Sequence, residues 1–236
     1  MENPHIPQYV LLQTEDVDSA RRWLCNELFF EASDNGDLCS GDFTLRLTPG
    51  PARMVAAPPS GTYHTGFAHI ALAAADIDEA LSYCRARDMT LQTDQGVSFV
   101  NPKVFGQGER YFNILTPFGV TVEVAQRIEH PCAKSSLPLR GLDHLGVPCA
   151  NFTEELAAFA ALGFTPLFQP VENENPAEGR IRCCMLSDRF LTLELYQFLD
   201  QTPLPMPDDA PLRGVGCYPR RMIPGRLRLF EKETSK

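Results

Sequence analysis

The feature that most constrains the fold of this chain is a pattern that occurs twice. In each copy, a strand-like segment carries a histidine, and a later strand-like segment carries a glutamate. The histidines are His69 and His144, and the glutamates are Glu123 and Glu194. Internal repeats indicate supersecondary units that bury their apolar surfaces by packing against one another. The chain is therefore expected to consist of repeated modules.

A helix is predicted directly after each histidine-bearing strand. Asp76 and Asn151 follow these strands, and each precedes a glutamate by three residues. This pattern is typical of a helix N-terminus, because a short polar side chain accepts a hydrogen bond from a free backbone N–H group there. The predicted helices span residues 77–87 and 152–162.

The N-terminal segment resembles a third copy of the pattern. Residues 9–20 align without gaps to residues 69–80, and the segment 43–47 is similar to the glutamate-bearing strands. At the two distinctive positions, however, this copy has Tyr9 and Arg46 instead of histidine and glutamate. We therefore expect it to keep the shape of a module without its site.

These repeats predict an α+β protein built from βαβββ modules. The first module, which lacks the His and Glu residues, is assigned to 1–50, the second to 62–128 and the third to 139–198. The remaining residues, 199–236, are rich in proline, which interrupts regular hydrogen bonding. We expect an irregular tail there, with one strand near 226–230.

Strand parity places the distinctive residues on one side of the sheet. Successive side chains of a strand point to opposite faces. In the segment 120–125 the valines share one face and leave Glu123 on the other, and the leucines of 191–195 do the same for Glu194. If the apolar faces lie under the helices, the carboxylates and the two imidazoles point into one concavity and can meet around a single cation.

The physical cost of burying carboxylates favours a metal at this place. Two buried carboxylates cost several kcal/mol each unless they are paired or bound to a cation. Module one is an internal comparison, since Tyr9 and Arg46 show that the architecture itself does not require His and Glu. We predict one divalent ion, and Zn²⁺, Ni²⁺, Co²⁺, Mn²⁺ and Fe²⁺ all suit this ligand set.

Composition narrows the classes of partner. The formal net charge of −9 argues against nucleic acid, whose phosphates favour basic surfaces. The longest apolar stretches are too short for a membrane span, and the N-terminus lacks the features of a signal peptide. A cytoplasmic protein that binds a small molecule is expected.

The paired His- and Glu-bearing strands resemble those of the vicinal oxygen chelate superfamily, which contains glyoxalase I, fosfomycin-resistance proteins, bleomycin-binding proteins and extradiol dioxygenases. The resemblance covers residues 66–197 well and 8–48 more faintly. It implies a glyoxalase-like cupped sheet with metal ligands on the first and last strands of paired modules. The residues at those positions are His69, Glu123, His144 and Glu194.

The resemblance also implies an activity. It suggests a glyoxalase-like metalloenzyme of the lyase or isomerase type, in which the ion polarises a small oxygenated substrate and Glu123 or Glu194 acts as general base. Ala73 lies in the region where many glyoxalases carry an arginine that grips glutathione, which argues against a glutathione product. The candidate substrate contacts are Tyr196, Arg182 and Tyr111.

Two other functions fit the same residues. One is an Fe(II)-dependent ring-cleaving dioxygenase that uses His69, His144 and Glu194 as ligands and leaves Glu123 uncoordinated. The other is a non-catalytic small-molecule-binding or resistance protein of the same superfamily. Three modules also leave module one without a partner, so we expect it to pair either with its copy in a homodimer or with the tail.

Overall fold

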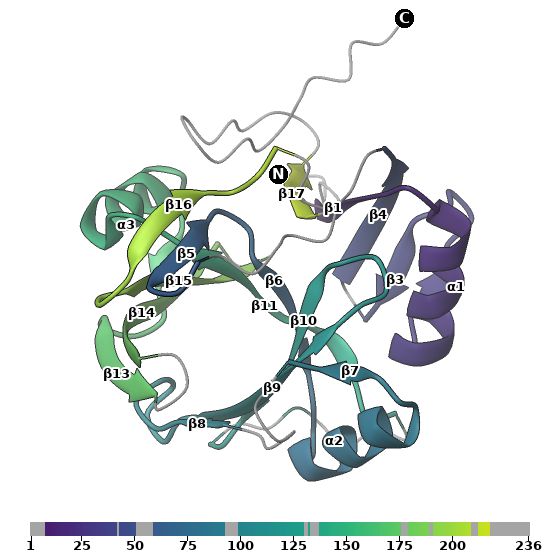
Figure 1. Cartoon of the computed structure of the whole chain (residues 1–236), viewed down its shortest axis with the longest axis horizontal. Coiled ribbons are helices and arrows are strands. Elements are labelled where there is room, and N and C mark those ends of the chain that lie inside the picture. The colour runs from purple at the N-terminus through teal and green to yellow at the C-terminus, as the bar shows by residue number, and fades with distance from the viewer. Residues whose placement is uncertain are drawn as a thin grey trace, which may run out of the picture.

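The computed structural model describes residues 8–41, 43–50, 59–92, 99–129, 132, 137–175, 179–188, 191–208 and 212–217. In these residues, a strand followed by a helix and then by three or four further strands occurs three times (Figure 1). Module one contains β1 (Gln8–Thr14), α1 (Val17–Leu28), β2 (Glu31–Ala32), β3 (Leu38–Ser40) and β4 (Phe43–Pro49). Module two contains β6 (His69–Ala73), α2 (Ile77–Ala86), β7 (Thr90–Leu91), β8 (Phe99–Asn101), β9 (Glu109–Leu115) and β10 (Thr121–Arg127). Module three contains β11 (Arg140–Pro148), α3 (Phe152–Ala161), β12 (Thr165–Pro166), β13 (Val171–Asn175), β14 (Gly179–Ser187) and β15 (Thr192–Phe198).

The three helices begin at polar caps. The side chain of Asp76 accepts hydrogen bonds from the backbone N–H groups at the start of α2, and Asn151 does the same for α3. Asp16 caps α1 in the same way. Both predicted helices are therefore confirmed, and each ends within one residue of its expected end.

Modules two and three share one large sheet. Its strand order is β12-β14-β15-β11-β6-β10-β9-β7, and two further strands join it, β13 paired with β14 and β8 paired with β9. The first strands of the two modules, β6 and β11, lie antiparallel at the centre. Figure 1 shows the sheet curving into a cup, with α2 and α3 on its outer side. The α+β class and the cupped sheet predicted from the sequence are confirmed.

A single apolar core joins the modules. Ile70 and Leu72 of β6 are buried in the same cluster as Ala80 and Leu81 of α2. Such side chains contribute about 1.5–3 kcal/mol each when fully buried. Because the outer face of the sheet holds these apolar residues, the inner face is left for polar ones.

The C-terminal segment contains regular strands, which corrects the expectation of an irregular tail. Two strands lie there, β16 (Thr202–Pro205) and β17 (Leu212–Cys217). β16 pairs in parallel with β5 (Thr62–Thr65), and its prolines alternate with residues that keep an N–H group. The N–H of Thr202, for example, donates to the carbonyl of Gly61. Alternation allows an edge strand to form despite its prolines. The strand predicted near 226–230 lies outside the described residues.

β17 pairs with β1 in the way that β11 pairs with β6. Tyr9 lies opposite Gly216 as His69 lies opposite Gly146, and the register of both pairs shifts at the corresponding step. Module one thus has a partner strand within the chain, as one of the two predicted arrangements requires. A homodimer is not needed to cover the edge of β1.

Within the described part of the chain, no helix is both long enough and apolar enough to cross a lipid bilayer.

Candidate metal centre

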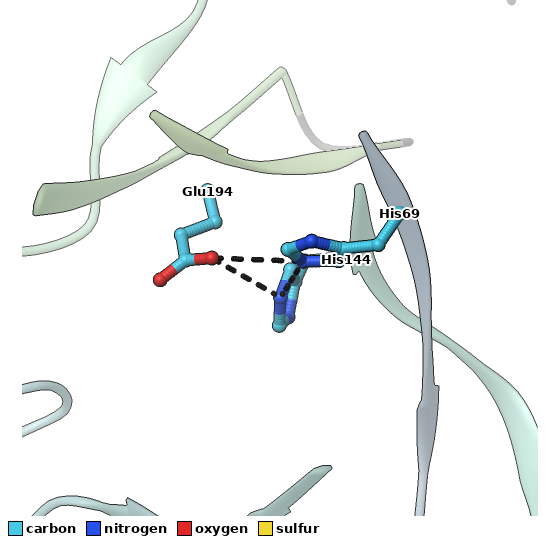
Figure 2. Close-up of side chains that lie close together, drawn as sticks. All are labelled: His69, His144 and Glu194. Carbon is cyan, nitrogen blue, oxygen red and sulfur yellow. Dashed lines mark hydrogen bonds and ion pairs between the residues drawn. The ribbon is translucent and has the colours of Figure 1, made fainter. Parts of the chain in front are cut away.

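The structure brings together the four residues predicted to bind a metal. They come from the four central strands of the large sheet: Glu194 from β15, His144 from β11, His69 from β6 and Glu123 from β10. Figure 2 shows three of them, His69, His144 and Glu194, pointing toward one another. Both histidines and Glu123 are buried. Residues far apart in the sequence therefore converge because β6 and β11 are neighbours.

The distances between donor atoms suit one small cation. The Nε2 atoms of His69 and His144 lie 3.3 Å apart. The Oε2 atom of Glu194 lies 3.6 and 3.7 Å from these nitrogens. Ligands that bind an ion tetrahedrally at about 2.1 Å are separated by about 3.4 Å. The donor atoms of the cluster are thus close enough together to coordinate one divalent cation.

Glu123 approaches the histidines differently from Glu194. Its Oε1 atom lies 3.3 Å from Nε2 of His144, and its Oε2 atom lies 3.8 Å from Nε2 of His69. A compact set with one atom per residue, all within 4.8 Å of one another, consists of His69, His144 and Glu194. Glu123 therefore borders the cluster with both oxygens, and Glu194 belongs to its compact part.

His144 is oriented by residues behind it. Its Nδ1 atom lies 3.0 Å from Oδ1 of Asp143, and Arg127 donates a hydrogen bond of 3.0 Å to the same oxygen. Burial opposes the charge of Asp143, but His144 and Arg127 outweigh it and lower the pKa of this carboxyl. An ionised Asp143 holds the Nδ1 proton, so that Nε2 faces the cluster. Such a carboxylate–histidine pair fixes the ring of a metal ligand.

The two histidines differ in their protonation without a metal. Burial, followed by the repulsion of His144, lowers the pKa of His69 to about 4, against the attraction of Glu123. Burial also opposes the charge of His144, but its bonds to Asp143 and Glu123 raise its pKa well above the ordinary value. At neutral pH, His69 therefore offers a free lone pair, while a cation must displace a proton from His144.

Gly146 makes room for His69. A Cβ atom at this position would lie 2.0–2.3 Å from the ring atoms of His69. The imidazole crosses directly over the backbone of β11, where only glycine fits. The sequence shows a glycine two residues after His144, but it does not show why glycine is needed there. The reason is the pairing of β6 with β11, which places Gly146 opposite His69.

His69, Glu123 and Glu194 line a cavity of about 220 Å³ on the inner face of the sheet, and His144 is buried behind them. Of the predicted substrate contacts, Tyr196 and Tyr111 line this cavity, and the ring of Tyr196 stacks at 6.1 Å from that of His69. Arg182 is not brought to the cavity. It donates two hydrogen bonds to Glu172, at 3.0 and 2.6 Å. Its neighbours on β14, Ile181 and Cys183, face inward, so Arg182 points to the other side of the strand.

Sequence reasoning missed several polar residues of the cavity. The most notable is Glu109, which is only 3% exposed and has an Oε2 atom without a hydrogen-bond partner. Burial, and then the neighbouring carboxylates, raise the pKa of Glu109 well above its usual range despite the nearby His144. The alternation of Glu109 with Tyr111 on β9 is the signal that could have placed it.

Comparison with known families agrees with this geometry. Residues 6–124, just over half of the 236-residue chain, match the model of the Glyoxalase/Bleomycin resistance protein/Dioxygenase superfamily. The chain therefore belongs to this superfamily. The matched region includes His69 and Glu123 and ends before the third module. A search of curated proteins found no match.

Solved structures with the same fold include glyoxalase I from Zea mays. The two are 18% identical with a TM-score of 0.55, and the alignment covers 84% of this chain and 70% of the maize protein. A glutamate-to-glutamine mutant of that enzyme gives 17% identity and the same TM-score, with 84% and 71% covered. Methylmalonyl-CoA epimerase from Streptomyces coelicolor aligns with 57% of this chain and 98% of its own, at 18% identity and a TM-score of 0.39. At these identities the likeness to the maize enzyme shows the fold alone.

Proposed function

We propose that this protein is a glyoxalase-like metalloenzyme of the lyase or isomerase type that acts on a small oxygenated substrate. The observation that carries the proposal is the donor cluster, in which two imidazoles and two carboxylates approach one another at 3.3–3.8 Å inside a cavity. His69, His144 and Glu194 would hold the ion, with Glu123 at its border. A bound divalent cation would act as a Lewis acid toward a substrate oxygen.

The chain's own residues supply the remaining functions. Glu123 is the carboxylate outside the compact ligand set, so it is the better candidate for the base that removes a proton next to a carbonyl. Tyr196 and Tyr111 line the cavity and can orient the substrate. The closed outer face of the sheet excludes water from one side, which strengthens these interactions.

The first test of the proposal is metal content. Protein purified without added metal is expected to hold about one divalent ion per chain. A chelator should lower its melting temperature, and the matching ion should restore it, because a ligand of the folded state alone stabilises that state by RT ln(1 + [L]/Kd). Comparing Zn²⁺, Ni²⁺, Co²⁺, Mn²⁺ and Fe²⁺ in this assay identifies the metal. Absence of any ion, together with unchanged melting in all five, would remove the proposal.

Two matched variants then separate the roles of the carboxylates. Glu194→Gln is expected to lose the ion, whereas Glu123→Gln should retain most of it and lose turnover. Turnover is followed as exchange of the proton next to the carbonyl with deuterated solvent. If Glu123→Gln exchanges as fast as the unaltered protein, Glu123 is not the base.

One observation favours a second candidate function. The compact set of two histidines and one glutamate is the arrangement found in non-haem iron oxygenases. An Fe(II)-dependent ring-cleaving dioxygenase would consume oxygen in the presence of a catechol only when loaded with ferrous iron. Exchange of the proton next to the substrate carbonyl in protein loaded with Zn²⁺ or Ni²⁺ would instead support the glyoxalase-like enzyme.

A further inference from the structure

The cavity contains an unusual number of hydrogen-bond acceptors that the protein itself does not use. The Oδ1 atoms of Asn101, Asn113 and Asn173 and the Oε2 atom of Glu109 are all buried and have no hydrogen-bond partner. All four residues line the cavity of the candidate metal centre. Glu109 and Asn173 are more than nine-tenths buried. A buried acceptor without a donor costs free energy, so such groups are rare in a folded protein unless they serve a ligand.

All four acceptors lie on strands, and two of them are also held by their own amide groups. Asn113 and Glu109 lie on the inner face of β9, and Asn113 is paired with Glu123 across the sheet. The amide nitrogen of Asn173 donates to Sγ of Cys183 at 3.6 Å, and Asn101 bonds to the same sulfur. Cys183 thus fixes the two amide groups from one side, and their oxygens remain for another donor.

The charges around the cavity exclude some ligands. Among the described residues that line it there are four glutamates and no lysine or arginine. The nearby Arg180 and Arg182 are engaged by Asp200 and Glu172. A carboxylate or phosphate would therefore meet no cation apart from the bound metal. That metal would balance Glu123 and Glu194. Of the other two carboxyl groups in the lining, Glu109 has its pKa raised by burial, which favours the neutral form, and Glu174 is exposed to solvent, which screens its charge. No buried charge is then left over to attract a cationic substrate.

We propose that the cavity takes a small, uncharged substrate rich in hydroxyl groups, such as a polyhydroxy ketone. This inference rests on the proposed function, in which a cation held by His69, His144 and Glu194 would act as a Lewis acid toward a substrate oxygen. The further hydroxyl groups donate hydrogen bonds to the amide oxygens of Asn101, Asn113 and Asn173 and contact the carboxyl group of Glu109. The cavity of about 220 Å³ is below the size of typical drug-sized pockets, which suits a substrate of a few carbon atoms.

A graded series of ketones tests this inference. Hydroxyacetone, dihydroxyacetone, erythrulose and xylulose share the hydroxy-ketone end and differ in the number of further hydroxyl groups. Calorimetry with metal-loaded protein is expected to show affinity rising by roughly threefold to tenfold for each hydroxyl that reaches an asparagine. Equal affinities across the series would overturn the inference.

Variants locate the effect. Asn113→Leu and Asn173→Leu keep nearly the same side-chain volume and remove the acceptor. Each should bind erythrulose about tenfold more weakly and retain the metal. Asn26→Leu makes the same change on the exposed surface of α1 and should leave the series unaltered. If the asparagine variants bind erythrulose as tightly as Asn26→Leu does, the amide oxygens do not recognise the hydroxyl groups.

The two proposals fail in different ways. Metal content measured on the same samples tests the proposed function, and the slope of the ketone series tests the substrate class. A bound metal with a flat series overturns only the inference. The series is also measured on chelator-treated protein, where an affinity that still rises with the number of hydroxyl groups would support the hydroxyl contacts independently of the metal.

Discussion

Two regions of this molecule share one architecture and differ in their central side chains. In module one, Leu11 of β1 pairs with Arg46 of β4. In module two, Ala71 pairs with Glu123 in the same register. Arg46 lies 3.8 Å from the centre of the Tyr9 ring and donates two hydrogen bonds of 2.8 Å to Asp37. The charge at this position is therefore balanced within the module.

In the cup formed by modules two and three, the charges at the corresponding positions have different partners. Its carboxylates, Glu123 and Glu194, face two imidazoles instead of a guanidinium. The position of His144 also differs between the two regions. His144 lies opposite Ala71 of β6, whereas Gly214 of β17 lies opposite the corresponding residue of β1, Leu11. The charge at this position is thus balanced by an arginine–aspartate pair in module one, and by the proposed cation in the cup of modules two and three.

The strongest test of this contrast removes one ligand. His144→Ala is expected to weaken metal binding on the order of 100-fold or more, since loss of even an outer partner of a ligand costs tenfold to 100-fold. The control is Arg46→Met, which changes the corresponding region of module one and should leave the metal content at one ion per chain. Metal analysis after dialysis measures both. Equal loss in the two variants would show that the regions are not functionally different.

A second prediction concerns the space around His69. In Gly146→Ala the new methyl group would overlap the imidazole, so His69 must move and metal affinity should fall by roughly tenfold to 100-fold. Gly50→Ala in module one is the matched control. Its methyl group would meet the amide end of the Gln13 side chain, which is flexible and can swing away. Unchanged metal affinity in Gly146→Ala would contradict the close approach of His69 to β11.

The sequence predicted the local and periodic features of both regions. Asp76 and Asn151 mark helix starts through their own hydrogen bonds, which depend on residues two or three positions away. Parity along β10 and β15 placed Glu123 and Glu194 inside the cup, because alternation is a property of each strand alone. The repeat then supplied the partners, since equivalent strands of similar modules occupy equivalent places.

The features that the sequence did not predict depend on long-range pairing or on irregular backbone. Pairing of module one with the tail was one of two expected arrangements, but the position of β17 was not predicted, because nothing near residues 212–217 indicates that they pair with β1. Arg182 was predicted as a substrate contact, but it binds Glu172 and does not line the cavity, since a residue's position along a strand does not say which face is inward until the neighbouring strand is known. Asp143 contacts His144 where the register of β11 shifts, and regular alternation would have pointed it away.

The third prediction concerns Glu109, whose carboxyl group is buried in the cup with an oxygen atom that has no hydrogen-bond partner. Glu109→Gln is expected to raise the unfolding free energy of metal-free protein at pH 8 by about 1–3 kcal/mol, because a buried carboxylate no longer has to lose its hydration. The pKa of Glu109 is raised in the folded state by burial and neighbouring carboxylates. Its contribution to stability is therefore present below the unfolded pKa and lost as pH rises through the folded one.

Denaturation in chelator at pH 5 and pH 8 measures this effect. The gap between Glu109→Gln and the unaltered protein should widen at the higher pH. Glu174→Gln alters an exposed carboxylate on the same cavity and should show no such gap. Parallel behaviour of the two variants would mean that Glu109 is hydrated in the absence of metal.

The smallest expected effect tests the balanced region directly. Tyr9 and Arg46 form a contact between a cation and an aromatic face, which contributes about 0.5–1 kcal/mol at a partly exposed site. A double-mutant cycle with Tyr9→Leu and Arg46→Met should give a coupling of that size in the free energy of unfolding. Metal content should stay constant throughout the cycle. A coupling near zero would leave the Asp37–Arg46 ion pair as the main counter-charge, and a change in metal content would show that module one takes part in the site.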